Sequence, residues 1–271
     1  MPTDSQKAPT EISNGPSAAS VAVAPGPRRQ TRILIVASPR PLTGKTFLAR
    51  LLADYLRLDG AAVMAFDLNP GKNDLADQLP AITTKVDLGK TQAQMVLFDR
   101  LSVDDCVAKV VDLGRRSYER FFALTEEIGF IEETRRRSIE AIVLFAADRH
   151  PASVRAFAEL TQRFPGTVLV PVFNERIAKV QELRNRYRSV HAAAAVPVQI
   201  PILLPALKVH TDTAGESFTD FHAPLADPSR IGLAYELHAW TIHTFREFRE
   251  LELRLLLEKL KRSLFGGPAN F

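Results

Sequence analysis

The chain has 271 residues, of which 46% are hydrophobic and 24% are charged, and its formal net charge is +4. No apolar run approaches the ~20 residues that a membrane-spanning helix needs, so these numbers exclude an integral membrane protein and predict a soluble globular one. The single cysteine, Cys106, excludes an internal disulfide and a zinc site built on several thiolates. The small positive charge permits an anionic partner without requiring one. We expect a cytoplasmic protein, since the chain does not begin with a signal-peptide-like apolar stretch.

The texture of the sequence divides the chain into three parts. Residues 1–30 are rich in Pro, Ser, Ala, Gly and Thr and have no lasting apolar period, which predicts a disordered N-terminal tail. Residues 31–228 alternate short apolar runs with stretches of helical period and are expected to form one domain. Residues 229–271 are rich in Leu, Glu and Arg with few helix breakers, which predicts a C-terminal extension made of one long helix, or of two in tandem.

Strand-like and helix-like segments alternate through the middle part. The strand candidates, in chain order, are residues 33–37, 62–66, 95–98, 107–111, 139–146 and 168–173. The helix candidates are residues 47–58, 117–137, 152–164 and 177–188. Residues 196–204 contain three prolines and are expected to form at most a short or edge strand. This alternation predicts an α/β fold with a mostly parallel sheet and helices on both faces.

The first predicted strand and helix enclose the most informative segment, which contains Gly44-Lys45-Thr46. Backbone amides at a helix N-terminus can bind phosphate oxygens. In such a loop Lys45 would reach the β- and γ-phosphates and the Thr46 hydroxyl would bind Mg²⁺. Pro39 stands where the first glycine of a phosphate loop usually lies. The alternative is an ordinary strand-to-helix turn with an exposed lysine.

Four motifs in order give the middle part a family resemblance. Residues 40–46, Arg-Pro-Leu-Thr-Gly-Lys-Thr, resemble the Lys-Gly-Gly-x-Gly-Lys-Thr loop of the deviant-Walker ATPases of the ParA/MinD group, in the SIMIBI class of P-loop proteins. Residues 64–70 are similar to the strand of that family that ends in Asp-x-Asp-Pro, and residues 109–114 to its Walker B strand. Residues 172–174 resemble the strand end whose asparagine lies near the adenine. The resemblance covers roughly residues 32–207.

The resemblance implies that the protein binds ATP and Mg²⁺. It places the metal on Thr46 and Asp112. Asp99 is a second candidate for the Walker B acid, because it follows the apolar run 95–98. The residues that the resemblance assigns to the nucleotide are Thr43, Gly44, Lys45, Thr46, Phe47 and Asn174.

The same segments depart from the family pattern at positions that matter for hydrolysis. Arg40 aligns with the signature lysine that contacts nucleotide across a dimer interface, and prolines at 39 and 41 remove two amide donors from the loop. Asn69 replaces the second aspartate of the Asp-x-Asp pair. An amide lacks the negative charge with which a carboxylate binds a metal ion or accepts a proton. Asp67 either positions water or caps the next turn. Arg40, Asp67 and Asn69 are therefore the catalytic candidates of a degenerate site.

These features predict a nucleotide-dependent switch of the ParA/MinD type that binds ATP and dimerises, with weak or absent hydrolysis. The processes that the resemblance implies are DNA or plasmid partition, transfer, and intracellular positioning. The alternative is a pseudo-ATPase that has lost the nucleotide and acts as a scaffold through its C-terminal helix.

Two surfaces are candidates for partners. The region Arg176–Arg188 carries five basic residues, and the acidic residues in it or directly before it are only Glu182 and Glu175. It either binds DNA non-specifically or is a solvated helix face. Leucines recur at helical spacing through residues 253–264, with basic neighbours, and resemble the membrane-targeting helix of the family. That stripe either binds a membrane surface or a protein partner, or packs on its own domain. If either surface binds such a partner, the cytoplasmic protein would associate with a membrane surface or with the nucleoid.

Overall fold

A computed structural model describes residues 30–69, 74–188, 196–211, 218 and 228–265. Its centre is a seven-stranded sheet in the order β3-β2-β4-β1-β5-β6-β7. Every neighbouring pair of strands is parallel. The strands are β1 (Arg32–Ala37), β2 (Val63–Asp67), β3 (Thr83–Lys85), β4 (Ala108–Asp112), β5 (Glu140–Ala146), β6 (Val168–Asn174) and β7 (Val198–Ile200).

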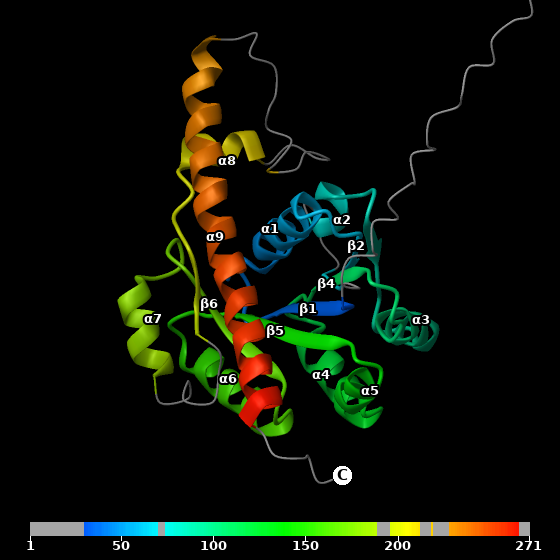
Figure 1. Cartoon of the computed structure of the whole chain (residues 1–271). Coiled ribbons are helices and arrows are strands. Elements are labelled where there is room, and N and C mark those ends of the chain that lie inside the picture. The colour runs from blue at the N-terminus through cyan, green and yellow to red at the C-terminus, as the bar shows by residue number, and fades with distance from the viewer. Residues whose placement is uncertain (1–29, 70–73, 189–195, 212–217, 219–227, 266–271) are drawn as a thin grey trace, which may run out of the picture.

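Helices cover both faces of this sheet (Figure 1). Buried residues of α3, α4, α5, α6 and α7 form one apolar cluster with the sheet, and those of α1, α2, α8 and α9 form the other. The helices are α1 (Lys45–Leu58), α2 (Leu75–Gln78), α3 (Thr91–Leu101), α4 (Tyr118–Glu127), α5 (Phe130–Arg136), α6 (Pro151–Arg163), α7 (Val180–Tyr187), α8 (Pro205–Thr211) and α9 (Pro228–Phe265).

The central strand shows why the sequence folds in this way. Successive side chains of a strand point to opposite faces. In β1, Ile33 and Ile35 accordingly pack in the cluster of α3–α7, while Leu34 and Val36 pack against α1 and α9. A strand buried on both sides is uniformly apolar, as parallel sheets require. The predicted α/β class, with helices on both faces and a C-terminal helix, is confirmed.

Two predicted elements were wrong. Residues 95–98 lie within α3 and not in a strand. Leu97 and Phe98 are buried while Met95 and Val96 are exposed, which is helical periodicity that a four-residue apolar run cannot reveal. The single helix expected over 117–137 is two helices, because Gly129 takes a left-handed conformation with φ 61° between α4 and α5. The short elements α2, β3 and α8 were not predicted.

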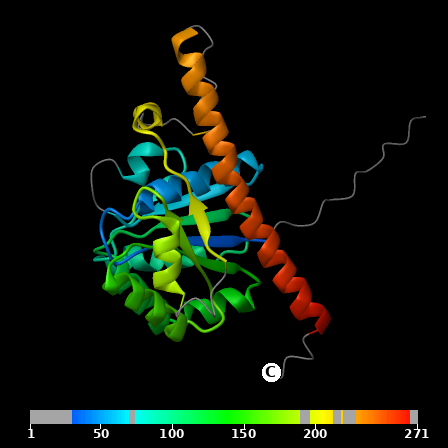
Figure 2. The same cartoon turned by 90° about the vertical axis from the view of Figure 1, so that its left-hand side faces the viewer.

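The C-terminal part is one helix, α9, which packs on β7 and α1 and crosses the molecule from end to end (Figure 2). Its middle turns bury five apolar residues in the core: Leu237, Trp240, Phe245, Phe248 and Leu251. Within the described ranges, no helix is both long and apolar enough to cross a membrane. The tail expected over residues 1–30 lies, except for Gln30, outside the described residues.

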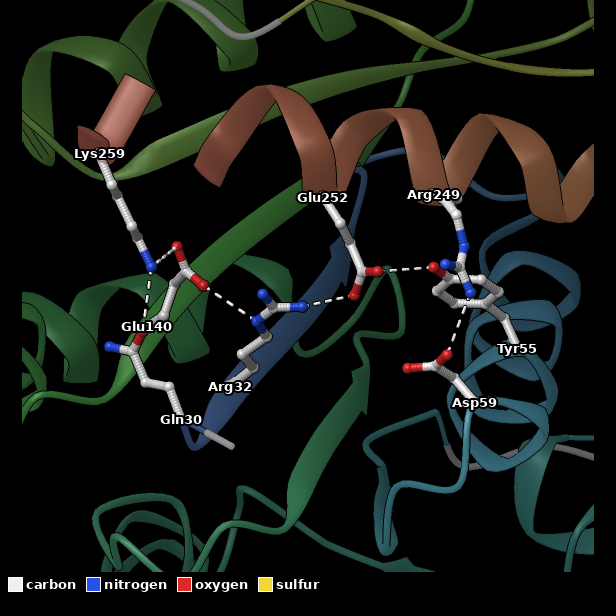
Figure 3. A network of polar contacts seen from close by, with 8 residues as sticks. All are labelled: Gln30, Arg32, Tyr55, Asp59, Glu140, Arg249, Glu252 and Lys259. Atoms are coloured by element: carbon white, nitrogen blue, oxygen red, sulfur yellow. Dashed lines mark hydrogen bonds and ion pairs between the residues drawn. The ribbon is translucent and has the colours of Figure 1, made fainter. Parts of the chain in front are cut away.

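A chain of polar contacts fastens the second half of α9 to the amino-terminal edge of the sheet (Figure 3). Glu140, the first residue of β5, pairs with Arg32 at 3.1 Å and with Lys259 at 2.7 Å. Glu252 pairs with Arg32 and accepts a hydrogen bond of 2.6 Å from the Tyr55 hydroxyl. The docked face of α9 is therefore both apolar and ionic.

Candidate functional site

The site predicted from the sequence lies at the carboxyl-terminal edge of the sheet. The strand order reverses at β1, which has β4 on one side and β5 on the other. Open parallel sheets bind ligands at such a switch point. Asp112 at the end of β4 is in register with Val36 of β1 and with Asp67 of β2. Thus two carboxylates and the start of the loop that precedes α1 meet at one edge.

Thr46 and Asp112 form the most direct contact in the site. The Thr46 hydroxyl donates a hydrogen bond of 2.6 Å to Oδ2 of Asp112. Asp112 is fully buried, and its Oδ1 has no hydrogen-bond partner within the described part of the chain. Burial raises the pKa of Asp112 to about 7, the hydrogen bond from Thr46 acts in the opposite direction, and the charge of Asp67 adds to the rise. Within the described chain, the negative charge of Asp112 is offset only by the Thr46 hydrogen bond and by the nearby charge of Lys45.

These two residues fit Mg²⁺. The metal prefers hard oxygen ligands and usually retains waters while it is held by one or two carboxylates and by phosphate oxygens. The Thr46 hydroxyl and the unpartnered Oδ1 of Asp112 are such oxygens. The residues that the structure describes contain no cluster of three or more His, Cys, Asp or Glu suited to a metal. A magnesium ion here would therefore need phosphate oxygens to complete its ligands.

Lys45 is folded back onto the loop. Its ammonium donates to the carbonyl oxygen of Arg40 at 2.6 Å and to the Thr43 hydroxyl at 3.4 Å. Burial lowers the pKa of Lys45, while the charges of Asp112 and Asp148 act to raise it. The first amides of α1 have no intrahelical acceptor, and the N-cap residue Gly44 (φ 83°) supplies no side-chain cap. The helix N-terminus and one ammonium group are therefore close together.

Asn174 and Phe47, two further predicted contacts, lie on different sides of the loop. A Cβ atom on Gly44 would lie 2.9 Å from Nδ2 of Asn174, so the end of β6 touches the loop and a side chain at position 44 would displace that amide. The Phe47 ring packs instead against the rings of Phe218 and Trp240, at centroid distances of 5.6 and 5.9 Å. Phe47 can therefore serve a ligand only through its backbone amide.

The loop itself is stiff and internally paired. Nε of Arg40 donates to Oδ2 of Asp148 at 3.1 Å. Pro39 and Pro41 lack amide donors. Leu42 has a φ of 58°, a conformation that costs energy for a residue with a Cβ, and is 92% exposed. The side chain of Arg40, which was predicted to take the place of the signature lysine, is thus engaged within its own chain.

The remaining predicted residues have local partners. Asp67 accepts hydrogen bonds from the amides of Asn69 and Ala76, at 2.8 and 3.0 Å, which is the capping geometry that the sequence left open. Burial raises the pKa of Asp67, and these two hydrogen bonds act to lower it. Asp99 is exposed on α3, so its placement at a strand end was wrong.

Sequence reasoning missed Asp148, whose side chain pairs with Arg40 across 108 residues of chain. It lies two residues beyond the end of β5. The available signal was its position, because a carboxylate just after a buried apolar run of a parallel sheet faces the same edge as Asp67 and Asp112.

An all-parallel sheet whose first strand leads through a Gly-Lys-Thr turn into α1 is a P-loop type of α/β fold. No protein-family model matches this sequence, and no curated protein sequence does. Among solved structures, the chain is similar to the MinD cell division protein of Aquifex aeolicus, with 14% identity and a TM-score of 0.44 over 77% of this chain and 97% of that one. It is likewise similar to a chain of the MinC:MinD cell division protein complex of the same organism, with 13% identity and a TM-score of 0.44 over 77% and 96%.

Proposed function

We propose that this protein binds Mg²⁺ and ATP at the N-terminus of α1 and acts as a nucleotide-dependent switch of the ParA/MinD type. In this proposal it forms a homodimer, hydrolyses ATP weakly or not at all, and serves DNA or plasmid partition, transfer or intracellular positioning. The single observation that carries the proposal is the contact between Thr46 and Asp112, with one oxygen of the buried carboxylate left unpartnered.

The parts of the proposed site have separate roles. The first amides of α1 and the ammonium of Lys45 would bind phosphate oxygens. The helix N-terminus has a partial positive charge, the ammonium has a full one, and the two lie close together. Thr46 and Asp112 would hold Mg²⁺, which neutralises phosphate charge when it is bound. Asn174, in contact with Gly44, would lie beside the nucleotide.

Binding requires a change in the loop. The Lys45 ammonium now donates to the Arg40 carbonyl oxygen at 2.6 Å, and it would have to exchange that acceptor for phosphate. The exchange is favourable only if the phosphate contact is stronger, which holds for hydrogen bonds between two charged groups.

Weak hydrolysis follows from the neighbours of Asp67. Both of its oxygens accept backbone hydrogen bonds, and Asn69 carries no charge. In a variant that still binds ATP, Asn69→Asp is expected to raise turnover. Unchanged turnover in that variant would count against the loss of this carboxylate as the cause.

Calorimetric titration of ATP-γ-S and ADP with Mg²⁺ tests the proposal. The wild type should bind saturably, and Lys45→Ala should weaken binding by about a hundredfold, because it removes a charged hydrogen bond and a buried positive charge. Lys90→Ala removes an exposed lysine and serves as the control, and thermal unfolding shows that each variant is folded. Absence of binding at millimolar nucleotide would contradict the switch.

A second candidate function is a scaffold without nucleotide. The observation that favours it is the internal pairing of the loop, in which Lys45 and Arg40 both have partners within the chain. The scaffold would act through α9, whose exposed leucines in the last turns are Leu253, Leu256, Leu257, Leu260 and Leu264.

The partner of α9 can be tested without unfolding the chain. Leu257→Gln and Leu260→Gln change exposed residues beyond the docked core. If the stripe binds a membrane, the double variant should no longer sediment with anionic liposomes. Unaltered sedimentation would leave the stripe without a membrane role.

The DNA surface has its own test. Arg176, Lys179, Arg184, Arg186 and Arg188 are all exposed around α7. Within the described residues, Glu182 pairs with Arg186 at 3.7 Å. Charge reversal at Arg184 and Arg186 should weaken salt-dependent retardation of random duplex DNA, and an unchanged shift would identify a solvated helix face.

A further inference from the structure

The turn that follows β4 presents two arginines at the same edge of the sheet as the proposed site. The amide of Ser117 donates to the carbonyl oxygen of Gly114 at 3.0 Å, which closes a four-residue turn. Arg115 and Arg116 occupy its two central positions and are both exposed. Their chain position, directly after Asp112 and Leu113, places them beside the carboxyl end of β4.

Both ends of this turn are fixed to the segment that follows β2. A Cβ atom on Gly114 would lie 2.8 Å from Cα of Asn69 and 2.9 Å from the carbonyl oxygen of Leu68, so only glycine permits this approach. At the other end, the buried Ser117 hydroxyl donates to the same Leu68 oxygen at 2.6 Å. The two arginines are therefore carried by a rigid part of the backbone, which lowers the entropy that a bound ligand must remove.

Of the two arginines, Arg115 is the nearer in the chain to Asp112, the last residue of β4. The positive charge of Arg115 also acts on Lys45, in the same direction as burial, which lowers the pKa of that lysine. Among the described residues Arg115 has no hydrogen bond or ion pair.

Arg40 and Arg115 thus differ in availability. The guanidinium of Arg40 is engaged by Asp148 at 3.1 Å, although Arg40 aligns with the cation that the family resemblance assigns to nucleotide. The guanidinium of Arg115 is exposed and unpaired within the described chain. The loop has also lost two amide donors to Pro39 and Pro41, so a polyphosphate bound there needs a donor from elsewhere.

We propose that Arg115 binds phosphate oxygens of the nucleotide's polyphosphate chain, from the rigid turn after β4. This inference rests on the nucleotide binding proposed above and adds the residue that compensates for the engaged Arg40. A guanidinium donates two parallel hydrogen bonds to one phosphate, which a lysine ammonium cannot do. A nucleic-acid backbone offers the same phosphate chemistry, but the neighbourhood of Lys45 and the N-terminus of α1 favours the nucleotide.

The test compares five proteins at one fixed salt concentration: the wild type, Arg115→Ala, Arg115→Lys, Arg116→Ala and Arg100→Ala. Arg100 is exposed in the last turn of α3, near the opposite edge of the sheet, so it controls for the loss of one charge. Calorimetry with Mg²⁺ and either ATP-γ-S or inorganic tripolyphosphate measures affinity. We expect Arg115→Ala to weaken both by about tenfold, Arg115→Lys to recover part of the loss, and the two controls to remain within about twofold.

The possible failures are distinguishable. If Arg115→Ala binds like the wild type while Lys45→Ala does not bind, the inference is overturned and the proposed function stands. If the wild type binds neither ligand, both are overturned. If Arg115→Ala reduces retardation of duplex DNA and leaves nucleotide affinity unchanged, the residue serves nucleic acid and the inference is wrong.

Discussion

The two edges of the sheet each hold a buried carboxylate, and the surroundings of these two carboxylates differ. At the amino-terminal edge, Glu140 is buried between Arg32 and Lys259, at 3.1 and 2.7 Å. At the carboxyl-terminal edge, Asp112 is completely buried with a hydroxyl on one oxygen and no partner for the other within the described chain. Glu140 thus has two cations within ion-pair distance. Among the described residues Asp112 has none, and the charge of Lys45 acts on it only from farther away.

This difference separates a structural role from a binding role. A buried charge is tolerated when nearby groups of opposite charge replace the water that it has lost. Around Glu140 those groups come from β1 and α9, and the result is a docked helix. Around Asp112 the compensation is left incomplete, which is the arrangement expected where a cation with its phosphates completes the site.

The largest expected effect is the pH dependence that Asp112 imposes on stability. Because burial raises its folded-state pKa to about 7, above the unfolded value of about 4, the folded protein binds this proton more tightly. Its contribution to stability is full below about pH 4 and is lost as pH rises toward 7. At about 1.4 kcal/mol per pH unit, the loss is on the order of 4 kcal/mol.

Asp112→Asn should abolish that loss, since the amide does not titrate and can still accept from Thr46. Urea unfolding of both proteins at pH 5 and pH 8, without divalent cations, gives the difference in unfolding free energy. The variant should gain stability over the wild type as pH rises. Equal pH dependence in the two proteins would mean that the charge of Asp112 is compensated as fully as that of Glu140. The contrast between the two edges of the sheet would then be wrong.

A smaller effect is expected at the other edge. Glu140→Ala removes the carboxylate between Arg32 and Lys259 and should cost about 3 kcal/mol of unfolding free energy, as for other buried ion pairs that lose one member. The control is Glu250→Ala, whose pair with Arg254 is about half exposed and should contribute less than about 0.5 kcal/mol. Similar costs for the two variants, measured by urea unfolding, would contradict a structural role for Glu140.

The smallest of the three effects concerns the turn beside Asp112. Gly114→Ala places a Cβ against the backbone of Leu68 and Asn69 and should cost about 2 kcal/mol. Gly232→Ala in α9 has open space around the new Cβ and should instead stabilise by up to about 1 kcal/mol. Thermal unfolding of both variants distinguishes them, and a neutral Gly114→Ala would show that the turn is not rigid.

Much of the fold was accessible from local pattern. The apolar run that becomes β1 and the leucine spacing of α1 are set by burial on both faces of a parallel sheet, so periodicity alone identified them. The Gly-Lys-Thr turn was likewise visible because strand, turn and helix are consecutive. Residues 95–98 failed because four apolar residues fit both a strand and one turn of a helix.

The sequence predicted the site only where its contacts join residues that are close in the chain. Asp112 follows an apolar run that forms a strand and lies beside Thr46, whereas the run before Asp99 lies in α3. The pairing of Arg40 with Asp148 joins residues 108 positions apart, and no spacing rule predicts it. The retracted position of Lys45 depends on the backbone path of the loop, which two prolines and a left-handed Leu42 set jointly.

The packing of Phe47 gives the molecule an intrinsic optical reporter. Phe47 belongs to the first turn of α1, directly after Lys45 and Thr46, and its ring contacts that of Trp240, 5.9 Å away. Trp240 is the single tryptophan of the chain, and its indole nitrogen donates to the carbonyl oxygen of Pro201 at 3.2 Å. A rearrangement of that turn would change the surroundings of Trp240 on α9. The tryptophan fluorescence of the unlabelled protein would therefore report a conformational change at the N-terminus of α1.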